Sequence, residues 1–369
     1  MHTSTVDDAD WPYLLTFLPA NLAESARQHR AFLRSRAIDS PQTLLRLILA
    51  YAAGAGSLRT VAAWATAREL ACLSDVALLK RFRRAAAWLG WLVTRLLAEQ
   101  TTLPAPTARP VRLRLLDATT ISRPGSAGTD WRVHLSFDLQ SLCVAGVELT
   151  DATGGESLTR AALAAGELWI ADRGYAHRAG IVAGARAGAT VIVRLNLQNV
   201  PLVQADGTPF DLLAALRSLP AATVGEFLGS TAPDPKRQLP AVAGRLIALR
   251  KSPAQAEAAR RRLHREARKD GRTPMAATLE AAGYIILFTT VPATEWDAAA
   301  IAALYRFRWQ IELAFKRLKG IVELDEMAAK DPDLCKTFLL GKLLLFLLTD
   351  RFRSGAAAFS PWGYGCPAA

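Results

Sequence analysis

Cysteine is scarce in this chain, and its spacing shows no pairing. Four cysteines occur in 369 residues, at positions 72, 143, 335 and 366, and none belongs to a C-x2-C pair. Closely spaced cysteines are what disulfide frameworks and structural zinc sites require. The sequence therefore predicts neither of these, and it fits a protein of the reducing cytoplasm.

Long apolar runs and a secretion signal are also missing. The strongest apolar run covers residues 338–348 and is interrupted by Gly341 and Lys342. A membrane-spanning helix needs about 20 apolar residues, so this run predicts a buried helix instead. Three aspartates stand among the first ten residues, where a signal peptide carries basic and then apolar residues. We expect neither secretion nor insertion into a membrane.

The motifs of several common enzyme classes are absent. The glycines at 125–128 and 154–155 follow no phosphate-loop or dinucleotide-binding spacing, so they predict turns. His134 and His177 are the only histidines near the expected core, and neither stands in an H-E-x2-H or nucleophile-elbow context. Structural roles are expected for both, and nucleotide hydrolysis has no support.

Acidic residues are outnumbered by basic ones, and about half of the chain is apolar. Lysine and arginine total 45 against 33 aspartates and glutamates, a net charge of +12, and 51% of the residues are hydrophobic. A chain of this size and composition buries a large core, arranged in two or three sub-domains. The basic excess favours a polyanionic partner, with nucleic acid ahead of an anionic membrane.

The first hundred residues show helical periodicity. Helices are predicted over residues 21–36, 40–53, 57–68 and 75–98, and Ser40-Pro41 and Ser57 read as helix starts. This all-helical region carries many dispersed arginines. They fit either contacts with a DNA backbone or an ordinary solvated surface, and only their number favours DNA. The proline-rich stretch 101–110 predicts a linker to the next domain.

Beyond the linker the periodicity changes to that of a mixed-sheet α/β domain. The pattern predicts strands at 111–116, 132–139, 142–149, 167–171 and 190–195, and helices near 157–165 and 176–187. It then weakens for about ninety residues, which indicates an insertion containing a strand at 242–249 and a very basic helix at 254–269. A strand at 284–290 and a continuous helix from 297 to 319 follow.

The helix predicted over 297–319 carries four polar residues whose spacing places them on one face. Tyr305, Arg308, Glu312 and Lys319 fall within a stripe roughly 60° wide on an α-helix. A carboxylate flanked by two cations and a phenol on one face suits a site that holds a metal ion together with phosphate oxygens. The alternative is a solvated amphipathic helix whose Arg308 and Glu312 merely pair four residues apart.

Two aspartates stand where a sheet would bring them to the same edge as Glu312. Asp117 closes an apolar strand in Leu-Leu-Asp-Ala-Thr-Thr, and Asp172 closes another in Ala-Asp-Arg-Gly-Tyr. Either alone reads equally as a turn former or helix cap. Taken jointly, three carboxylates would repel one another unless a divalent cation compensates them. Ligands that are all oxygen favour Mg²⁺ or Mn²⁺, so a two-metal phosphoryl-transfer site is predicted, with Asp117, Asp172 and Glu312 as ligands.

In these motifs, from Asp117 to Lys319, the sequence resembles the DDE transposases of bacterial insertion sequences, and the Tyr-Arg-Glu-Lys signature is that of the insertion-sequence-four family. The resemblance implies an RNase H-like catalytic core and two Mg²⁺ ions, for which Mn²⁺ can substitute. It further implies nicking and strand transfer at the inverted-repeat ends of double-stranded DNA, joining to target DNA, and a homodimer in the DNA complex. Tyr305, Arg308 and Lys319 would hold DNA phosphates.

The expected division of the chain follows from the same resemblance. It comprises a helical DNA-binding domain at 1–105, the first part of the core at 106–195, an insertion domain at 196–283, the second part of the core at 284–352 and a short tail at 353–369. Relatives often continue with helices that pair two subunits, so the ending looks shortened. Two alternatives therefore stay open: an RNase H-like endonuclease that does not transpose, and a shortened DNA-binding inhibitor of transposition.

Members of this family form a DNA hairpin, which requires a nucleotide to leave the base stack, where an aromatic ring can hold it. In relatives a tryptophan on the strand before the signature helix does this, and the matching position here is Tyr284. Burial of Tyr284 in the core is an equal alternative. Trp309, beside Arg308, is a second candidate for DNA stacking.

Overall fold

The computed structural model describes residues 10–54, 56–101, 112–140, 143–195, 198–220, 224–269, 271–324, 327 and 329–357. The chain forms two compact units. Unit 1 comprises Met1–Thr107, Ala118–Gly154 and Leu313–Ala369, and unit 2 comprises Ala108–Asp117 and Gly155–Glu312. Strand β1 (Arg112–Ile121) and helix α12 (Trp309–Val322) each pass from one unit into the other. The five-part division expected from the sequence stays a prediction.

Unit 1 opens with helices in all four predicted ranges, preceded by one further helix; the helix expected over 21–36 is shorter, and the one expected over 75–98 is divided into two. They are α1 (Asp10–Leu15), α2 (Leu22–Gln28), α3 (Pro41–Ala52), α4 (Leu58–Ala67), α5 (Asp75–Phe82) and α6 (Ala86–Thr101). The Ser40 and Ser57 side chains accept hydrogen bonds from the third residue of α3 and of α4, so both predicted helix starts are confirmed. The helix expected over 21–36 ends with α2, where Arg30 takes a left-handed φ of 57°.

The helix α13 (Pro332–Ala357) completes the helical part of unit 1. Its residues Leu339, Leu343, Leu344 and Leu347 are buried, and it packs on α3 and α6. The prediction of a buried helix over 338–348 is therefore confirmed. No helix among the described residues is long and apolar enough to span a membrane. Unit 1 also contains the strands β2 (Trp131–Asp138) and β3 (Cys143–Asp151), which pair antiparallel in the order β3-β2-β1.

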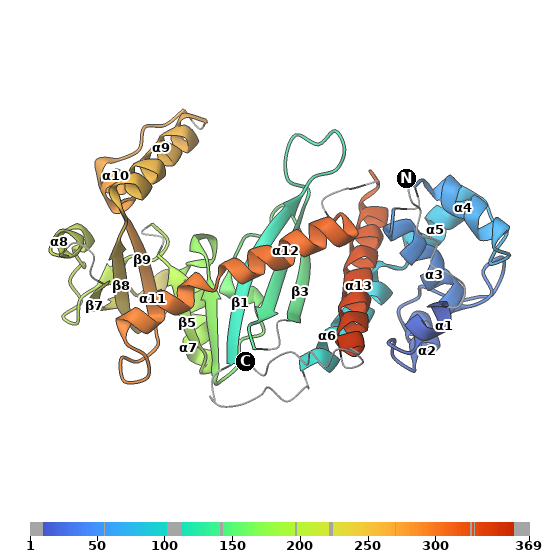
Figure 1. Ribbon diagram of the computed structural model, residues 1–369, viewed down its shortest axis with the longest axis horizontal. Coiled ribbons are helices and arrows are strands. Elements are labelled where there is room, and N and C mark those ends of the chain that lie inside the picture. Colours follow the sequence, from blue (N-terminus) through green and yellow to red (C-terminus); the bar gives the residue numbers. More distant parts are fainter. Residues whose placement is uncertain are drawn as a thin grey trace. The chain divides into compact units, whose positions relative to one another are not determined.

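Unit 2 is built on a mixed sheet in the order β1-β4-β5-β9-β8-β7-β6 (Figure 1). Its further strands are β4 (Glu167–Ala171), β5 (Thr190–Arg194), β6 (Leu202–Val203), β7 (Val224–Thr231), β8 (Ala243–Arg250) and β9 (Tyr284–Thr289). β1, β4 and β5 run parallel, whereas the pairs from β5 to β6 are antiparallel. The predicted α/β class, a mixed-sheet core after an all-helical N-terminal region, is confirmed for the described residues.

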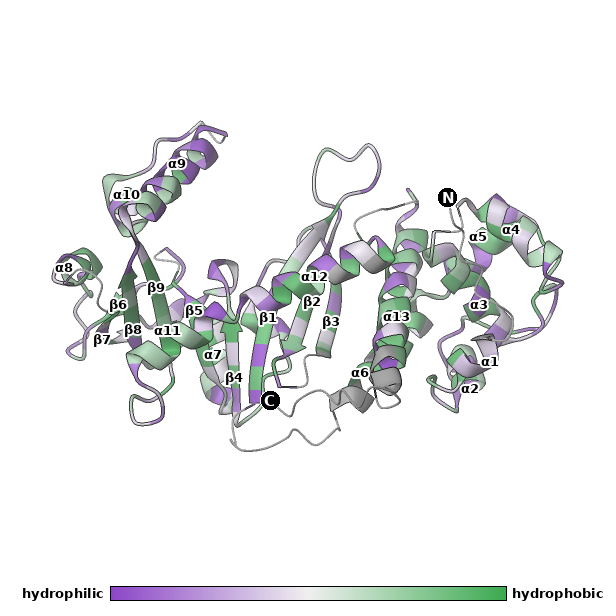
Figure 2. Cartoon of the chain, viewed as in Figure 1, coloured by the Kyte–Doolittle hydropathy of each residue, from purple (hydrophilic) through white to green (hydrophobic). Residues whose placement is uncertain are grey.

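Unit 2 also contains helices. They are α7 (Arg178–Ala187), α8 (Leu212–Arg217), α9 (Pro253–Lys269), α10 (Ala276–Ala281) and α11 (Ala298–Arg306). The helix expected over 157–165 is reduced to a single 3-10 turn at Leu158–Arg160, a wrong prediction. The apolar residues of this segment do not continue along one helical face, and within the 3-10 turn only Leu158 is buried. The strands expected in the weakly patterned segment, such as β8, extend the sheet beyond β9, and Figure 2 shows the apolar colour of both strands.

Gly244 on β8 sets how closely that strand packs against β9. A Cβ added at Gly244 would lie 2.6 Å from the Thr289 carbonyl oxygen and would also meet the Phe288 ring. We expect Gly244→Ala to lower the free energy of unfolding by about 1–3 kcal/mol, because backbone and a buried ring must shift. Urea unfolding measures this. Gly128→Ala, which adds its methyl into open space, is the matched control, and equal losses in both variants would contradict the argument.

Candidate active site and an adjoining basic cavity

The two predicted aspartates lie on neighbouring parallel strands of unit 2. β1 and β4 are in register with Leu116 opposite Ala171, so Asp117 and Asp172 follow at adjacent positions. Asp172 stands directly after β4, as predicted. Asp117 does not end its strand: β1 continues to Ile121, because its last residues pair in unit 1 beyond the point where β4 stops. Asp117 and Asp172 nevertheless stand at adjacent positions on neighbouring strands.

The signature residues do not share one helix: Tyr305 lies on α11, Arg308 in the turn that follows it, and Glu312 and Lys319 on α12. α11 ends at Arg306 and α12 begins at Trp309, so the continuous helix predicted over 297–319 is wrong. Between them the Arg308 amide donates to the Tyr305 carbonyl (3.1 Å), a bond spanning three residues in place of four. Such tightening alters the helical phase, so the stripe computed from a uniform 100° step does not apply.

Despite this break, two signature residues contact all three predicted carboxylates. The Tyr305 hydroxyl donates a hydrogen bond of 3.0 Å to Asp172 Oδ1. Arg308 Nη2 donates to Glu312 Oε1 at 2.6 Å, and its Nη1 lies 3.6 Å from Asp117 Oδ2. The pairing of Arg308 with Glu312 was the ordinary alternative for this helix. The structure contains that pair, but the same guanidinium also reaches a strand of the sheet.

Electrostatics keep both of these donors protonated. Burial raises the pKa of Tyr305, and the charge of Asp172 raises it further. Burial by itself would lower the pKa of Arg308, but the charge of Asp172, together with Tyr305 and Glu312, outweighs it and the pKa is raised. Tyr305 therefore remains a neutral hydroxyl, and Arg308 a cation, throughout the pH range in which DNA is stable.

The remaining signature and aromatic residues are placed differently. Lys319 lies in the last turn of α12, in the part of that helix that belongs to unit 1. Trp309 opens α12 with 49% of its surface exposed. His134, for which a structural role was expected, is buried and its Nε2 pairs with Thr150 Oγ1 and the Gly154 carbonyl oxygen, as a structural residue does.

The carboxylates fit a divalent cation in donor chemistry. Asp117, Asp172 and Glu312 offer only oxygen, which suits Mg²⁺ or Mn²⁺. Among the described residues no three acidic, histidine or cysteine side chains are gathered closely enough to hold a metal ion. In this arrangement the Arg308 guanidinium is the cation that Asp117 and Glu312 share. Metal binding by Asp117 and Glu312 would compete with these two ion pairs.

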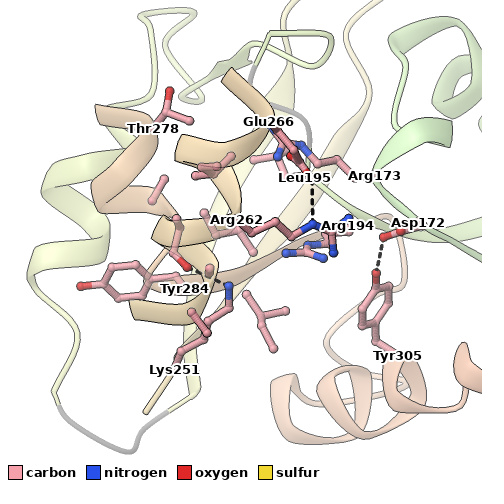
Figure 3. A pocket seen from close by; sticks show the side chains of 17 residues that line it. Asp172, Arg173, Arg194, Leu195, Lys251, Arg262, Glu266, Thr278, Tyr284 and Tyr305 are labelled. Carbon is pink, nitrogen blue, oxygen red and sulfur yellow. Dashed lines mark hydrogen bonds and ion pairs between the residues drawn. The ribbon is translucent and has the colours of Figure 1, made fainter. Parts of the chain in front are cut away.

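A cavity of about 650 Å³ adjoins Asp172 and Tyr305 within unit 2 (Figure 3). Its charged lining is mostly basic: Arg173, Arg194, Lys251 and Arg262, with Asp172 and Glu266. The pKa of Lys251 is lowered, first by burial and then by the charge of Arg194. Such an excess of cations beside a candidate catalytic carboxylate attracts a phosphate-bearing ligand.

Sequence reasoning missed these four cations because distant segments supply them. Arg194 ends β5, Lys251 follows β8, and Arg262 lies on α9. The sheet order places the strand ends beside Asp172, and that order is not visible in local periodicity. One signal was available: Arg173 directly follows Asp172 in the Asp-Arg-Gly-Tyr motif.

Tyr284 lines the far side of the same cavity. It is half-buried, so the alternative of full burial in the core does not apply. Its ring lies under the Arg250 guanidinium (5.5 Å to the ring centroid), and Arg250 Nη2 donates to its hydroxyl at 3.1 Å. Figure 3 shows this hydroxyl pointing away from Asp172 and Tyr305.

Carboxylates on adjacent strands of a mixed sheet, contacted by a tyrosine at the end of α11 and an arginine in the following turn, fit a phosphoryl-transfer enzyme of the DDE class. Residues 109–348 match the family "Transposase DDE domain", and the chain belongs to this family. Its members cleave DNA and join its strands in transposition, and they generally use a divalent metal.

Two curated relatives in Escherichia coli match nearly the whole chain. The putative transposase InsL for insertion sequence element IS186A is 41% identical over 362 residues, 96% of this chain and 97% of the relative. The transposase for insertion sequence element IS421 is 40% identical over 363 residues, with the same coverage. A solved chain titled "piggyBac transposase synaptic complex with hairpin DNA" aligns over 96% of this chain and 77% of its own, with TM-score 0.48 and 8% identity.

Proposed function

We propose that this transposase nicks and joins DNA at the inverted-repeat ends of an insertion sequence, with Mg²⁺ as the metal. The observation that carries the proposal is the linkage of Tyr305 to Asp172 and of Arg308 to both Asp117 and Glu312. One cluster thereby combines carboxylates for metal with donors for phosphate. Action on the element's own DNA would place the protein in the cytoplasm, and a homodimer would hold the two ends.

Each residue has a distinct role in this proposal. Asp117, Asp172 and Glu312 would hold two Mg²⁺ ions, which when bound supply activation of the attacking hydroxyl and stabilisation of the leaving oxygen. Arg308 has a forked guanidinium suited to two phosphate oxygens, and Tyr305 presents a neutral hydroxyl. Lys319 would add a cation further along α12. Trp309, exposed at the start of α12, would contact bases or sugars.

The N-terminal region would contribute DNA binding. Eight of its dispersed cations are exposed, although Arg59 lies 3.8 Å from Asp75 and Arg83 is paired with Asp331: Arg27, Arg30, Arg34, Arg36, Arg59, Lys80, Arg83 and Arg84. These exposed cations supply sequence-independent attraction to the DNA backbone. The contribution of residues 1–105 is measured by the salt dependence of DNA binding by the full chain.

The proposal is tested by incubating the protein with DNA that carries the repeats flanking its gene, with Mg²⁺ or Mn²⁺. A new 3′-hydroxyl at the repeat boundary, followed by joining to target DNA, is expected. Cutting without preference for paired repeats would instead indicate an endonuclease of the same fold. Specific binding without any product would indicate an inhibitor of transposition.

A prediction for hairpin formation concerns Tyr284. We expect Tyr284→Ala to lower hairpin formation about tenfold while nicking continues, because stacking of a base on an aromatic ring contributes about 1–3 kcal/mol. Tyr284→Phe keeps the ring and removes only the hydroxyl that binds Arg250, so it should retain hairpin formation. Denaturing gels of pre-nicked end DNA measure both products. Unchanged hairpin formation in Tyr284→Ala would eliminate the stacking role.

A further inference from the structure

The helix α9 is highly charged and mostly exposed, unlike a helix of the protein core. Over its 17 residues it carries six lysines and arginines and two glutamates, and of its residues only Ala256 is buried. Figure 1 shows α9 and α10 projecting beyond the ends of β8 and β9, and Figure 2 shows α9 as largely hydrophilic. A helix that buries so little gains little stability from packing. Its exposed surface therefore calls for another explanation.

The two sides of α9 differ in what they face. Ala258, Ala259, Arg262, Leu263 and Glu266 line the cavity beside Asp172. A second, open groove is lined by Ala258, Arg261, His264, Arg265 and Arg268. Ala258 borders both, and the other residues of the two sets are offset by about two residues, roughly 200° around the helix. The groove therefore lies on the side of α9 that faces away from the cavity, and we call Arg261, His264, Arg265 and Arg268 the outer face.

Ion pairing leaves most of the outer-face charge unneutralised. On the cavity side, Arg262 pairs with Glu266 at 2.7 Å. On the outer face only Arg261 pairs, with Glu257 at 3.3 Å. The side chains of Arg265 and Arg268 make no ion pair or hydrogen bond with any residue that the structure describes. The outer face thus presents a row of cations about 10 Å long, from the rise of 1.5 Å per residue.

We propose that the outer face of α9 binds the phosphodiester backbone of duplex DNA, independently of sequence. Its cations complement a duplex that carries one negative charge per about 1.7 Å of axis. α9 has no tryptophan, tyrosine or phenylalanine, and single-strand binding depends on stacking rings of that kind. This inference rests on the proposed function for its biological setting. It adds a second DNA contact to that function, on the outer face of α9.

The proposal is tested by binding alone, so it does not depend on cleavage. The full chain is titrated in EDTA with a duplex of unrelated sequence and with a single strand of the same length, over a range of salt. The variant carries Arg261→Gln, Arg265→Gln and Arg268→Gln. The charge-matched control carries Arg186→Gln, Lys236→Gln and Arg237→Gln, exposed positions that line neither the cavity nor the groove.

The outer-face variant is expected to bind the duplex at least about tenfold more weakly and to lose about three from the slope of log K against log salt, one for each lost phosphate contact. The control should lose less than half of that. An equal loss of affinity in both variants would mean that only the net charge of the protein matters, and would overturn the proposal.

A loss of affinity for the single strand alone would mean that the outer face binds single-stranded DNA instead of a duplex. An unchanged slope would also overturn the proposal. Circular dichroism melting confirms that each variant is folded. A failure of nicking in the repeat-end assay, with these binding results intact, would count against the proposed function alone.

Discussion

Glu312→Gln is expected to abolish metal-dependent nicking while leaving DNA binding within a few-fold of the unaltered protein. Glutamine has nearly the same shape and can still accept a hydrogen bond from Arg308, whose Nη2 lies 2.6 Å from Glu312 Oε1. It removes the negative charge that a divalent metal requires. A metal contributes several kcal/mol to phosphoryl transfer, and each 1.36 kcal/mol is tenfold in rate, so a loss of about 10³-fold or more is expected.

The measurement is the amount of 3′-hydroxyl product at the repeat boundary, with Mg²⁺ and with Mn²⁺. Glu295→Gln is a suitable control, because Glu295 is an exposed residue of unit 2 and the substitution removes the same charge outside the cluster. Nicking by Glu312→Gln at the rate of the unaltered protein would remove Glu312 from the catalytic set. Absence of product from all three proteins, with specific binding intact, would favour an inhibitor of transposition.

The candidate catalytic residues could be proposed from the sequence because each stands in a recognisable local pattern. Asp172 follows a short apolar strand and Asp117 lies on another, which their local patterns predict; that β1 and β4 are neighbours in register, with Asp117 beside Asp172, comes from the sheet order. Their roles as metal ligands remain a prediction. The sequence could not show that Arg308 would stand between Asp117 and Glu312, because this depends on the turn that separates α11 from α12.

The errors of the sequence-based fold share one physical cause. Periodicity reports which residues are apolar but not where backbone hydrogen bonding changes. The helix expected over 75–98 contains a break between α5 and α6, and the one expected over 297–319 contains a break at Phe307 and Arg308. Neither break contains a proline or glycine to mark it. The basic cavity was missed for a different reason, since strand order alone brings Arg194 and Lys251 beside Asp172.

The position of Arg308 predicts a competition between metal binding and the resting ion pairs of the cluster. Before a metal ion can be shared by Asp117 and Glu312, the guanidinium that they now share has to leave. A DNA phosphate offers Arg308 an alternative partner of the same charge and geometry. DNA would therefore release the carboxylates as it binds, and metal affinity should rise with DNA present. By thermodynamic reciprocity, the metal should strengthen DNA binding by the same factor.

Arg308→Gln is accordingly expected to have two opposite effects. In the absence of DNA the variant should bind Mn²⁺ about tenfold more tightly, because the metal no longer competes with the Arg308–Glu312 bond. A hydrogen bond to a charged group contributes about 1.5–3 kcal/mol, and the half-exposed Glu312 places this bond at the low end of that range. With DNA, nicking should fall at least about a hundredfold, since two phosphate hydrogen bonds are lost. Electron paramagnetic resonance of free Mn²⁺ measures the first effect, and gel analysis the second.

Arg306→Gln is the matched control, because Arg306 is an exposed arginine two residues away on α11 and should change neither quantity. Arg308→Lys retains a cation without the fork, so its Mn²⁺ affinity should stay near that of the unaltered protein while nicking falls. A loss of nicking in Arg308→Gln without any gain in Mn²⁺ affinity would mean that Arg308 serves the phosphate alone. A gain in affinity that disappears once DNA is added is the specific result that the shared guanidinium predicts, because phosphate and metal would then be coupled through this one side chain.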